Sequence, residues 1–132
     1  MKKVCLCLFL FILYIARTFA DDDPVSKVAA IIRQANMHEL SALMAENIDV
    51  AVPGDENTYS KTRAAAVLTN FFNQNRPVSV KILHKINSSA KYHFGVLLMN
   101  TGKGVYRIAL TFKEVNGAFQ LIELRIETEK VK

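Results

Sequence analysis

The sequence predicts an α+β domain in which helices pack on one face of an antiparallel sheet. Three observations lead to this prediction. Apolar residues recur at helical spacing in three segments between residues 24 and 76, they alternate with polar residues from residue 80 onward, and turn-forming residues separate the alternating runs. The predicted order is helix, helix, strand, helix and then four strands, which is typical of helices gathered on one side of a sheet.

A leader precedes this domain. Two lysines open the chain, residues 4–15 form an unbroken apolar run, and residues 18–20 offer small side chains for cleavage just before Asp21. This order is typical of a secretory signal peptide, and the apolar run is too short to span a bilayer about 30 Å thick. We therefore expect residues 1–20 to be a signal peptide. Residues 21–132 then form a single domain that is periplasmic or secreted, with no stable membrane anchor after cleavage.

Cleavage changes the composition on which functional arguments depend. Cys5 and Cys7 are the chain's 2 cysteines and both lie in the leader, so we expect the mature domain to have no disulfide, thiolate nucleophile or cysteine metal site. Three of the 17 basic residues also lie in the leader, which leaves 14 against 12 acidic residues and lowers the formal charge from +5 to +2. Such a balance argues against binding to nucleic acid.

Two helices are expected first. Asp23 is a suitable N-cap and Pro24 a suitable first helical residue, because the first turn does not use the N–H that proline lacks. Asn36 ends this helix and caps the next, with Glu39 three residues on. The buried faces of the two helices are expected to carry Val25, Val28, Ala29, Ile31, Ile32 and Ala35, and then Leu40, Leu43 and Met44.

A strand over residues 48–52 follows, and Pro53-Gly54 ends it. Ser60 is expected to cap the third helix, with Tyr59 packing against Ala64 at its start. Four strands then follow, with alternating residues from Val80, Tyr92, Tyr106 and Ile122 onward, which we expect to form a meander.

The last hairpin allows a prediction of register. A two-residue loop at Asn116-Gly117 would set aliphatic residues opposite charged ones, whereas a three-residue loop with a bulge pairs Leu110 with Ile122. We therefore expect the three-residue loop. It places Gln120 and Ile122 on the inner face of the sheet and the charged residues on the outer face, together with Leu121.

These elements resemble the nuclear transport factor 2-like superfamily, whose cone-shaped, cystatin-like fold packs three N-terminal helices on a curved sheet. The nearest resemblance is to a family of small exported bacterial proteins whose domain is of unknown function. The matching stretches are Val52-Pro53-Gly54, Tyr59-Ser60-Lys61, Phe71-Phe72, Leu83-His84-Lys85, Tyr106-Arg107 and Leu124-Arg125-Ile126-Glu127.

The resemblance implies a fold and leaves the chemistry open, because this superfamily includes isomerases, dehydratases, transport factors and ligand carriers. Its steroid-isomerase-like enzymes use a carboxylate base together with a tyrosine and an acid inside the cone. The predicted inner face of the last two strands offers Tyr106 and Gln120 but no acid. This departure argues against an isomerase-type mechanism, and we assign no catalytic residue.

The candidate pocket residues are Tyr59, Phe72, His84 and Tyr106. His84 shares the expected strand face of Val80 and Ile82, so we expect it to point into the cone, where it could act as a base or contact a ligand. The alternative is that these residues are ordinary packing groups. The three scattered histidines have no metal-ligand spacing, so we expect no metal and no cofactor.

The candidate interface residues are Arg107, Leu121, Glu123 and Arg125 on the outer face of the last two strands. They indicate either cross-strand ion pairs exposed to solvent or a homodimer, since members of the superfamily often pair through this surface. We therefore expect a non-enzymatic module of the cell envelope that binds a small apolar ligand or an envelope protein. The alternatives are a pocket enzyme, isomerase- or hydrolase-like, that uses His84 with Tyr59 or Tyr106, and a structural subunit of an envelope assembly.

Overall fold

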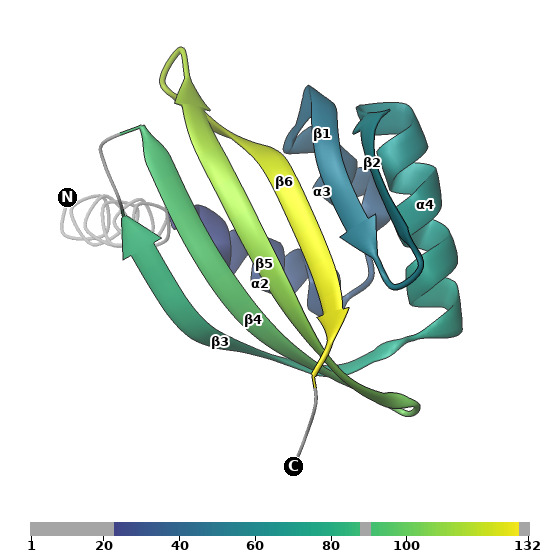
Figure 1. Ribbon diagram of the computed structural model, residues 1–132. Helices are drawn as coiled ribbons and strands as arrows, with labels where there is room; N and C mark the ends of the chain where they lie inside the picture. Colours follow the sequence, from purple (N-terminus) through teal and green to yellow (C-terminus); the bar gives the residue numbers. More distant parts are fainter. Residues whose placement is uncertain (1–22, 88–90, 130–132) are drawn as a thin grey trace, which may run out of the picture.

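The computed structural model describes residues 23–87 and 91–129, so the expected signal peptide lies outside the described residues. The elements, in chain order, are α2 (Pro24–Arg33), α3 (Met37–Ala42), β1 (Met44–Val52), β2 (Asp55–Ser60), α4 (Lys61–Gln74), β3 (Pro77–Asn87), β4 (Tyr92–Thr101), β5 (Gly104–Val115) and β6 (Ala118–Thr128). Figure 1 shows α2 and α3 behind a curved sheet and α4 beside β1 and β2. None of the described helices is long and apolar enough to cross a bilayer.

The three predicted helix caps are confirmed. The side chain of Asp23 accepts a hydrogen bond from the Val25 N–H at 3.1 Å, and Asn36 accepts one from the Glu39 N–H at 3.2 Å. Ser60 accepts the corresponding bond from the Arg63 N–H at 3.4 Å. Each cap satisfies an amide that has no partner within its own helix, so these boundaries follow from local sequence.

The sheet has the order β2-β1-β6-β5-β4-β3. Its pairs are antiparallel except β1 with β6, which run parallel. The expected order lacked β2, a strand of sequence DENTYS that has no buried residue and lies at the edge of the sheet. The Pro53-Gly54 pair that was expected to end β1 instead turns the chain into β2, and Gly54 adopts a positive φ of 90° that favours glycine.

The core lies between the helices and the sheet face that they cover, which we call the inner face; the opposite face is the outer face. Inward-pointing residues of the long strands, such as Leu97, Ile108 and Leu124, are fully buried. Gly95 lies on the inner face of β4, directly against α2. A Cβ atom at this position would lie 2.6 Å from a methyl carbon of Val25, so the absence of a side chain allows the helix to approach the sheet.

The register predicted for the last hairpin is wrong. Its loop is the two-residue Asn116-Gly117 turn, with φ values of 51° and 81°, a combination typical of a type I′ turn. A bulge in β6 at Ile122 then corrects the phase, so Phe112 pairs with Leu121 and Leu110 pairs with Leu124. Leu121 therefore points inward and is fully buried, whereas Ile122 and Gln120 are only partly buried.

Candidate functional site

Two of the predicted pocket residues, Phe72 and Tyr106, take part in packing around the end of α4. Phe72 belongs to the core and is only 2% exposed. The Tyr106 hydroxyl donates a hydrogen bond of 2.9 Å to the Asn75 side-chain oxygen, and its ring packs edge-on against Phe71 at 5.3 Å between centroids. Since Asn75 caps α4, Tyr106 ties β5 to the end of this helix.

Tyr59 lies on the edge strand β2 and is partly buried. Its hydroxyl donates a short hydrogen bond to the Asp55 carboxylate. This bond stabilises the protonated phenol and raises the pKa of Tyr59 above its usual range. The Tyr59 hydroxyl therefore already donates its hydrogen bond to Asp55, which lies four residues earlier on the same strand.

The expectation that His84 points into the cone is wrong. A bulge between Ile82 and His84 inserts one residue into β3, and His84 pairs with Val96 on the outer face. The side chain is exposed. His84 and Tyr59 also lie on strands at opposite edges of the sheet, and Tyr106 pairs with the inward-pointing Met99. The structure therefore does not bring His84 together with either tyrosine.

The outer face is organised in rows, because paired residues on neighbouring strands lie on the same face. One row from β3 to β2 runs through His84, Val96, Ala109, Arg125, Ala51 and Glu56. A second runs through Ile86, Phe94, Thr111, Glu123, Asp49 and Thr58, and a third through Lys81, Leu98, Arg107 and Glu127. Of the interface candidates, Arg107, Glu123 and Arg125 lie in these rows, whereas Leu121 is buried in the core and is not available to a partner.

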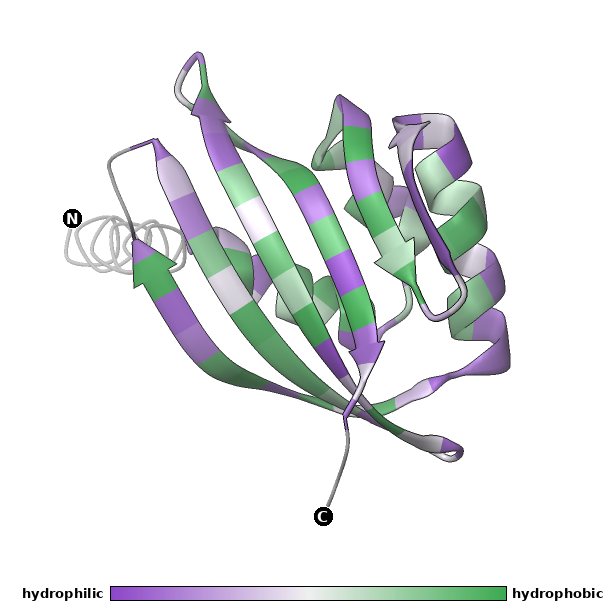
Figure 2. Cartoon of the chain, viewed as in Figure 1, coloured by the Kyte–Doolittle hydropathy of each residue, from purple (hydrophilic) through white to green (hydrophobic). Residues whose placement is uncertain are grey.

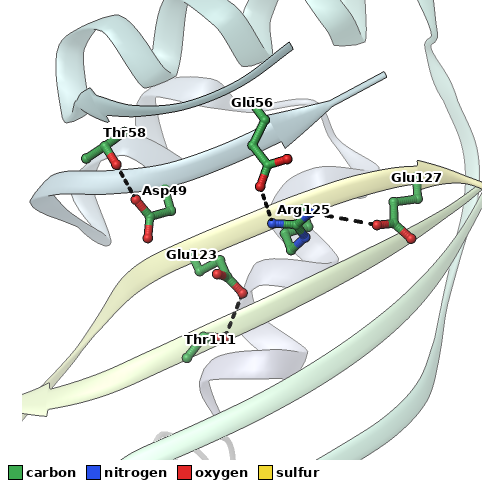
Figure 3. Close-up of polar contacts among 7 residues, drawn as sticks. All are labelled: Asp49, Glu56, Thr58, Thr111, Glu123, Arg125 and Glu127. Atoms are coloured by element: carbon green, nitrogen blue, oxygen red, sulfur yellow. Dashed lines mark hydrogen bonds and ion pairs between the residues drawn. The ribbon is translucent and has the colours of Figure 1, made fainter. Parts of the chain in front are cut away.

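The acidic end of these rows holds three separate groups of polar contacts (Figure 3). The Arg125 guanidinium donates to the Glu56 carboxylate at 2.8 Å and lies 3.9 Å from the Glu127 carboxylate. The Glu56 bond raises the pKa of Arg125 further above its usual value. Thr58 donates to Asp49 at 2.5 Å. This part of the outer face carries four carboxylates, those of Asp49, Glu56, Glu123 and Glu127, against the one guanidinium of Arg125, so it is acidic.

The centre of the outer face is apolar. The side chains of Phe94, Val96 and Leu98 on β4 lie there half-buried, and Ile86 on β3 is 55% exposed. Since the inward-pointing residues of β4 are also apolar, Figure 2 shows a nearly continuous hydrophobic run along this strand, whereas β6 alternates. In an antiparallel sheet with one solvated face the strands usually alternate, so β4 has the composition of a strand covered on both faces.

Buried polar groups and clusters of metal-ligating side chains are not found in the part of the chain that the structure describes. No polar or charged residue within 23–87 and 91–129 is buried. The same ranges contain no cluster of three or more histidine, aspartate or glutamate side chains that could hold a metal ion.

A family model described as a domain of unknown function (DUF4783) matches residues 25–127. The chain belongs to this family. No curated protein sequence matches it significantly.

Solved structures of three DUF4783 family proteins match the fold. The protein from Bacteroides ovatus is 20% identical, with 79% of this chain and 94% of that chain covered and a TM-score of 0.74. The protein from Bacteroides uniformis is 17% identical, with 83% and 100% covered and a TM-score of 0.77. The protein from Bacteroides fragilis is 21% identical, with 82% and 100% covered and a TM-score of 0.74.

A designed protein, "Rd1NTF2_04 with long sheet", also matches at 16% identity, with 85% of this chain and 99% of that chain covered and a TM-score of 0.64. The predicted α+β, nuclear transport factor 2-like fold is therefore confirmed.

Proposed function

We propose that this DUF4783 domain is an exported, non-enzymatic protein-binding module of the cell envelope, and that the outer face of its sheet is the binding surface. The observation that carries the proposal is the apolar character of β4 on both faces. The inner residues of this strand are buried by the helices, while Phe94, Val96 and Leu98 lie half-buried with no element of the described chain over them. Clustered apolar side chains on a surface mark interaction sites.

A second copy of this chain fits the surface best. The β3 side of the outer face is basic, because Lys81 lies there and β3 has no acidic residue. Arg107 lies beside the apolar centre and is paired with Glu129 at 2.9 Å. The β6 and β2 side is acidic, with Glu123 and Glu56. A two-fold axis through the apolar centre would set the basic side of one copy against the acidic side of the other. An isologous interface requires this self-complementarity.

The oligomeric state tests the proposal. We expect the purified protein to sediment at twice the mass of one chain, and a Val96→Glu variant to sediment as a monomer, because the new carboxylate would lie in the desolvated centre of the interface. Thr62→Glu, on the exposed surface of α4, adds the same charge away from the interface and is the matched control. The dimer should also weaken with added salt, since its flanking charge pairs are exposed. A wild-type protein that remains monomeric at about 100 μM would contradict the proposed self-pairing.

The export component rests on the leader sequence. It predicts that the mature protein begins at Asp21 and is recovered outside the cytoplasm. Intact-mass measurement of the protein from the envelope fraction gives the first residue directly. Recovery of the full-length chain from the cytoplasm would contradict this component and leave the binding component to be judged by sedimentation.

A further inference from the structure

A pocket of about 410 Å³ opens between the start of α2 and the turn that joins β5 to β6. It lies between the helices and the inner face of the sheet, and so is separate from the outer face. Phe112 closes its inner end and is 1% exposed, while Leu43 and Phe119 are partly buried against the core and form its walls. The volume falls within the range of pockets that bind small molecules.

The described side chains that line this pocket are apolar except for one. Lys27 is the only charged residue among the described residues that line it. Its side chain is exposed on α2 and makes no ion pair or hydrogen bond with any described residue. By contrast, the cationic residue of the two pockets on the outer face, Arg125, is paired with Glu56. An ammonium group with no partner among the described residues therefore lies at the rim of a pocket whose other described side chains are apolar.

Small residues keep the pocket open. Gly117 and Ala118 form part of its edge, and Ala118 is exposed. The adjacent Phe119 is held in place by His93, whose ring packs edge-on against it at 4.4 Å between centroids. This part of the wall is thus formed by a packed aromatic ring and by the backbone of the turn, so a ligand would enter a pocket that already exists.

We propose that this pocket binds an amphiphile with an anionic head group, of which an alkyl carboxylate is the simplest form. The alkyl chain would lie against Leu43, Phe112 and Phe119, and the carboxylate would pair with the Lys27 ammonium at the rim. Both parts of such a ligand contribute to binding. The apolar side chains of the pocket favour the alkyl chain, and the Lys27 ammonium selects the charge of the head group.

Isothermal titration with a matched pair of probes, decanoate and decyltrimethylammonium, tests the proposal. We expect decanoate to bind and the cation of equal chain length to bind more weakly. From octanoate to decanoate the affinity should rise about fourfold per methylene, the increase expected for burying each group in hydrocarbon. Equal binding of both head groups, or no binding of decanoate at millimolar concentration, would overturn the proposal.

Variants locate the site. Leu43→Trp puts a larger ring into the wall of the pocket and should remove detectable decanoate binding; Leu43→Phe serves as the test if the tryptophan variant does not fold. Lys27→Gln should weaken decanoate binding about twofold to fivefold, the range for an exposed ion pair, whereas Arg33→Gln near the opposite end of α2 should not. Decanoate binding that Leu43→Trp or Leu43→Phe leaves unchanged would place the ligand elsewhere and refute the site.

This proposal is independent of the proposed function, because the pocket and the outer face lie on opposite sides of the sheet. Val96→Glu, which should abolish the dimer, should leave decanoate affinity unchanged. Leu43→Trp should leave the dimer intact. The sedimentation and titration experiments can therefore contradict one proposal while supporting the other.

Discussion

The contact between Gly95 and Val25 makes the packing of α2 on the sheet quantitatively testable. An alanine at residue 95 would put its methyl carbon 2.6 and 2.7 Å from the two methyl carbons of Val25, about 1 Å inside normal contact. Overpacking of this kind costs about 1–3 kcal/mol, and the loss of glycine flexibility in the unfolded chain returns about 0.5–1 kcal/mol. We therefore expect Gly95→Ala to lower the free energy of unfolding by about 1–2 kcal/mol.

Val25→Ala supplies the second arm of a double-mutant cycle. Val25 is 1% exposed, so the loss of two methyl groups should cost about 2 kcal/mol, including the cavity that they leave. In the double variant the contacts at 2.6 and 2.7 Å disappear, leaving the Cβ atom of residue 25 at 3.2 Å, and the new methyl group of residue 95 partly fills that cavity. The double variant should then be destabilised by about 1–2 kcal/mol, well below the sum of the single changes.

Urea unfolding followed by far-UV circular dichroism measures all four proteins. If the two single effects simply add, or if Gly95→Ala alone is neutral, α2 does not lie where the structure places it and the reasoning fails.

Three further outcomes are expected from single variants. Leu121→Ala should lower the free energy of unfolding by about 2–5 kcal/mol in the same urea experiment, because the side chain is fully buried; a near-zero effect would restore the register predicted from sequence. Tyr106→Phe should cost about 1 kcal/mol for the lost hydrogen bond to Asn75, and an unchanged unfolding midpoint would mean that this bond is not formed in solution. Partial burial acts to raise the pKa of Asp23, but hydrogen bonds, led by the one from Lys85, outweigh it and lower the pKa below 3.8. The resulting stability is present above pH 3.8 and is lost as the pH falls through the lowered pKa of Asp23. Lys85→Met should therefore lower the free energy of unfolding by up to about 1 kcal/mol at pH 7. The urea midpoints of this variant and of the wild type should converge as the pH is lowered from 7 to 2.

The sequence predicted the features that depend on neighbouring residues. Asp23, Asn36 and Ser60 cap helices where they were expected to, because a cap is a hydrogen bond over two or three residues. β2 was not predicted, because it has no buried side chain and therefore no alternation to detect. Its neighbour β1 was predicted only over residues 48–52, since the start of this strand lacks an alternating pattern.

The errors in the candidate site have one physical cause. Side chains of a strand alternate between two faces, so an added residue reverses the face of everything beyond it. One such residue precedes His84 and another, Ile122, separates Leu121 from the rest of β6. Neither bulge is marked by a glycine or proline, and so the face of His84 and that of Leu121 were both predicted incorrectly.

The pocket beside α2 was not predicted from the sequence either. Lys27 belongs to the first helix, and Phe119 follows a turn near the end of the chain. Their proximity depends on how α2 crosses the sheet, which is a property of tertiary packing. The only local signal was the pair of small residues in the last turn, and turns contain small residues for other reasons.

The parallel pairing of β1 with β6 has a consequence for the order in which this protein can mature. The strand made last occupies an interior place in the sheet, and the first hairpin has no other strand to join. During synthesis the sheet edge of β1 therefore stays unpaired, and its apolar residues stay partly exposed, until β6 has been made near the end of the chain. Such late completion of the sheet would suit the export proposed from the leader sequence, because a translocation channel threads unfolded chains.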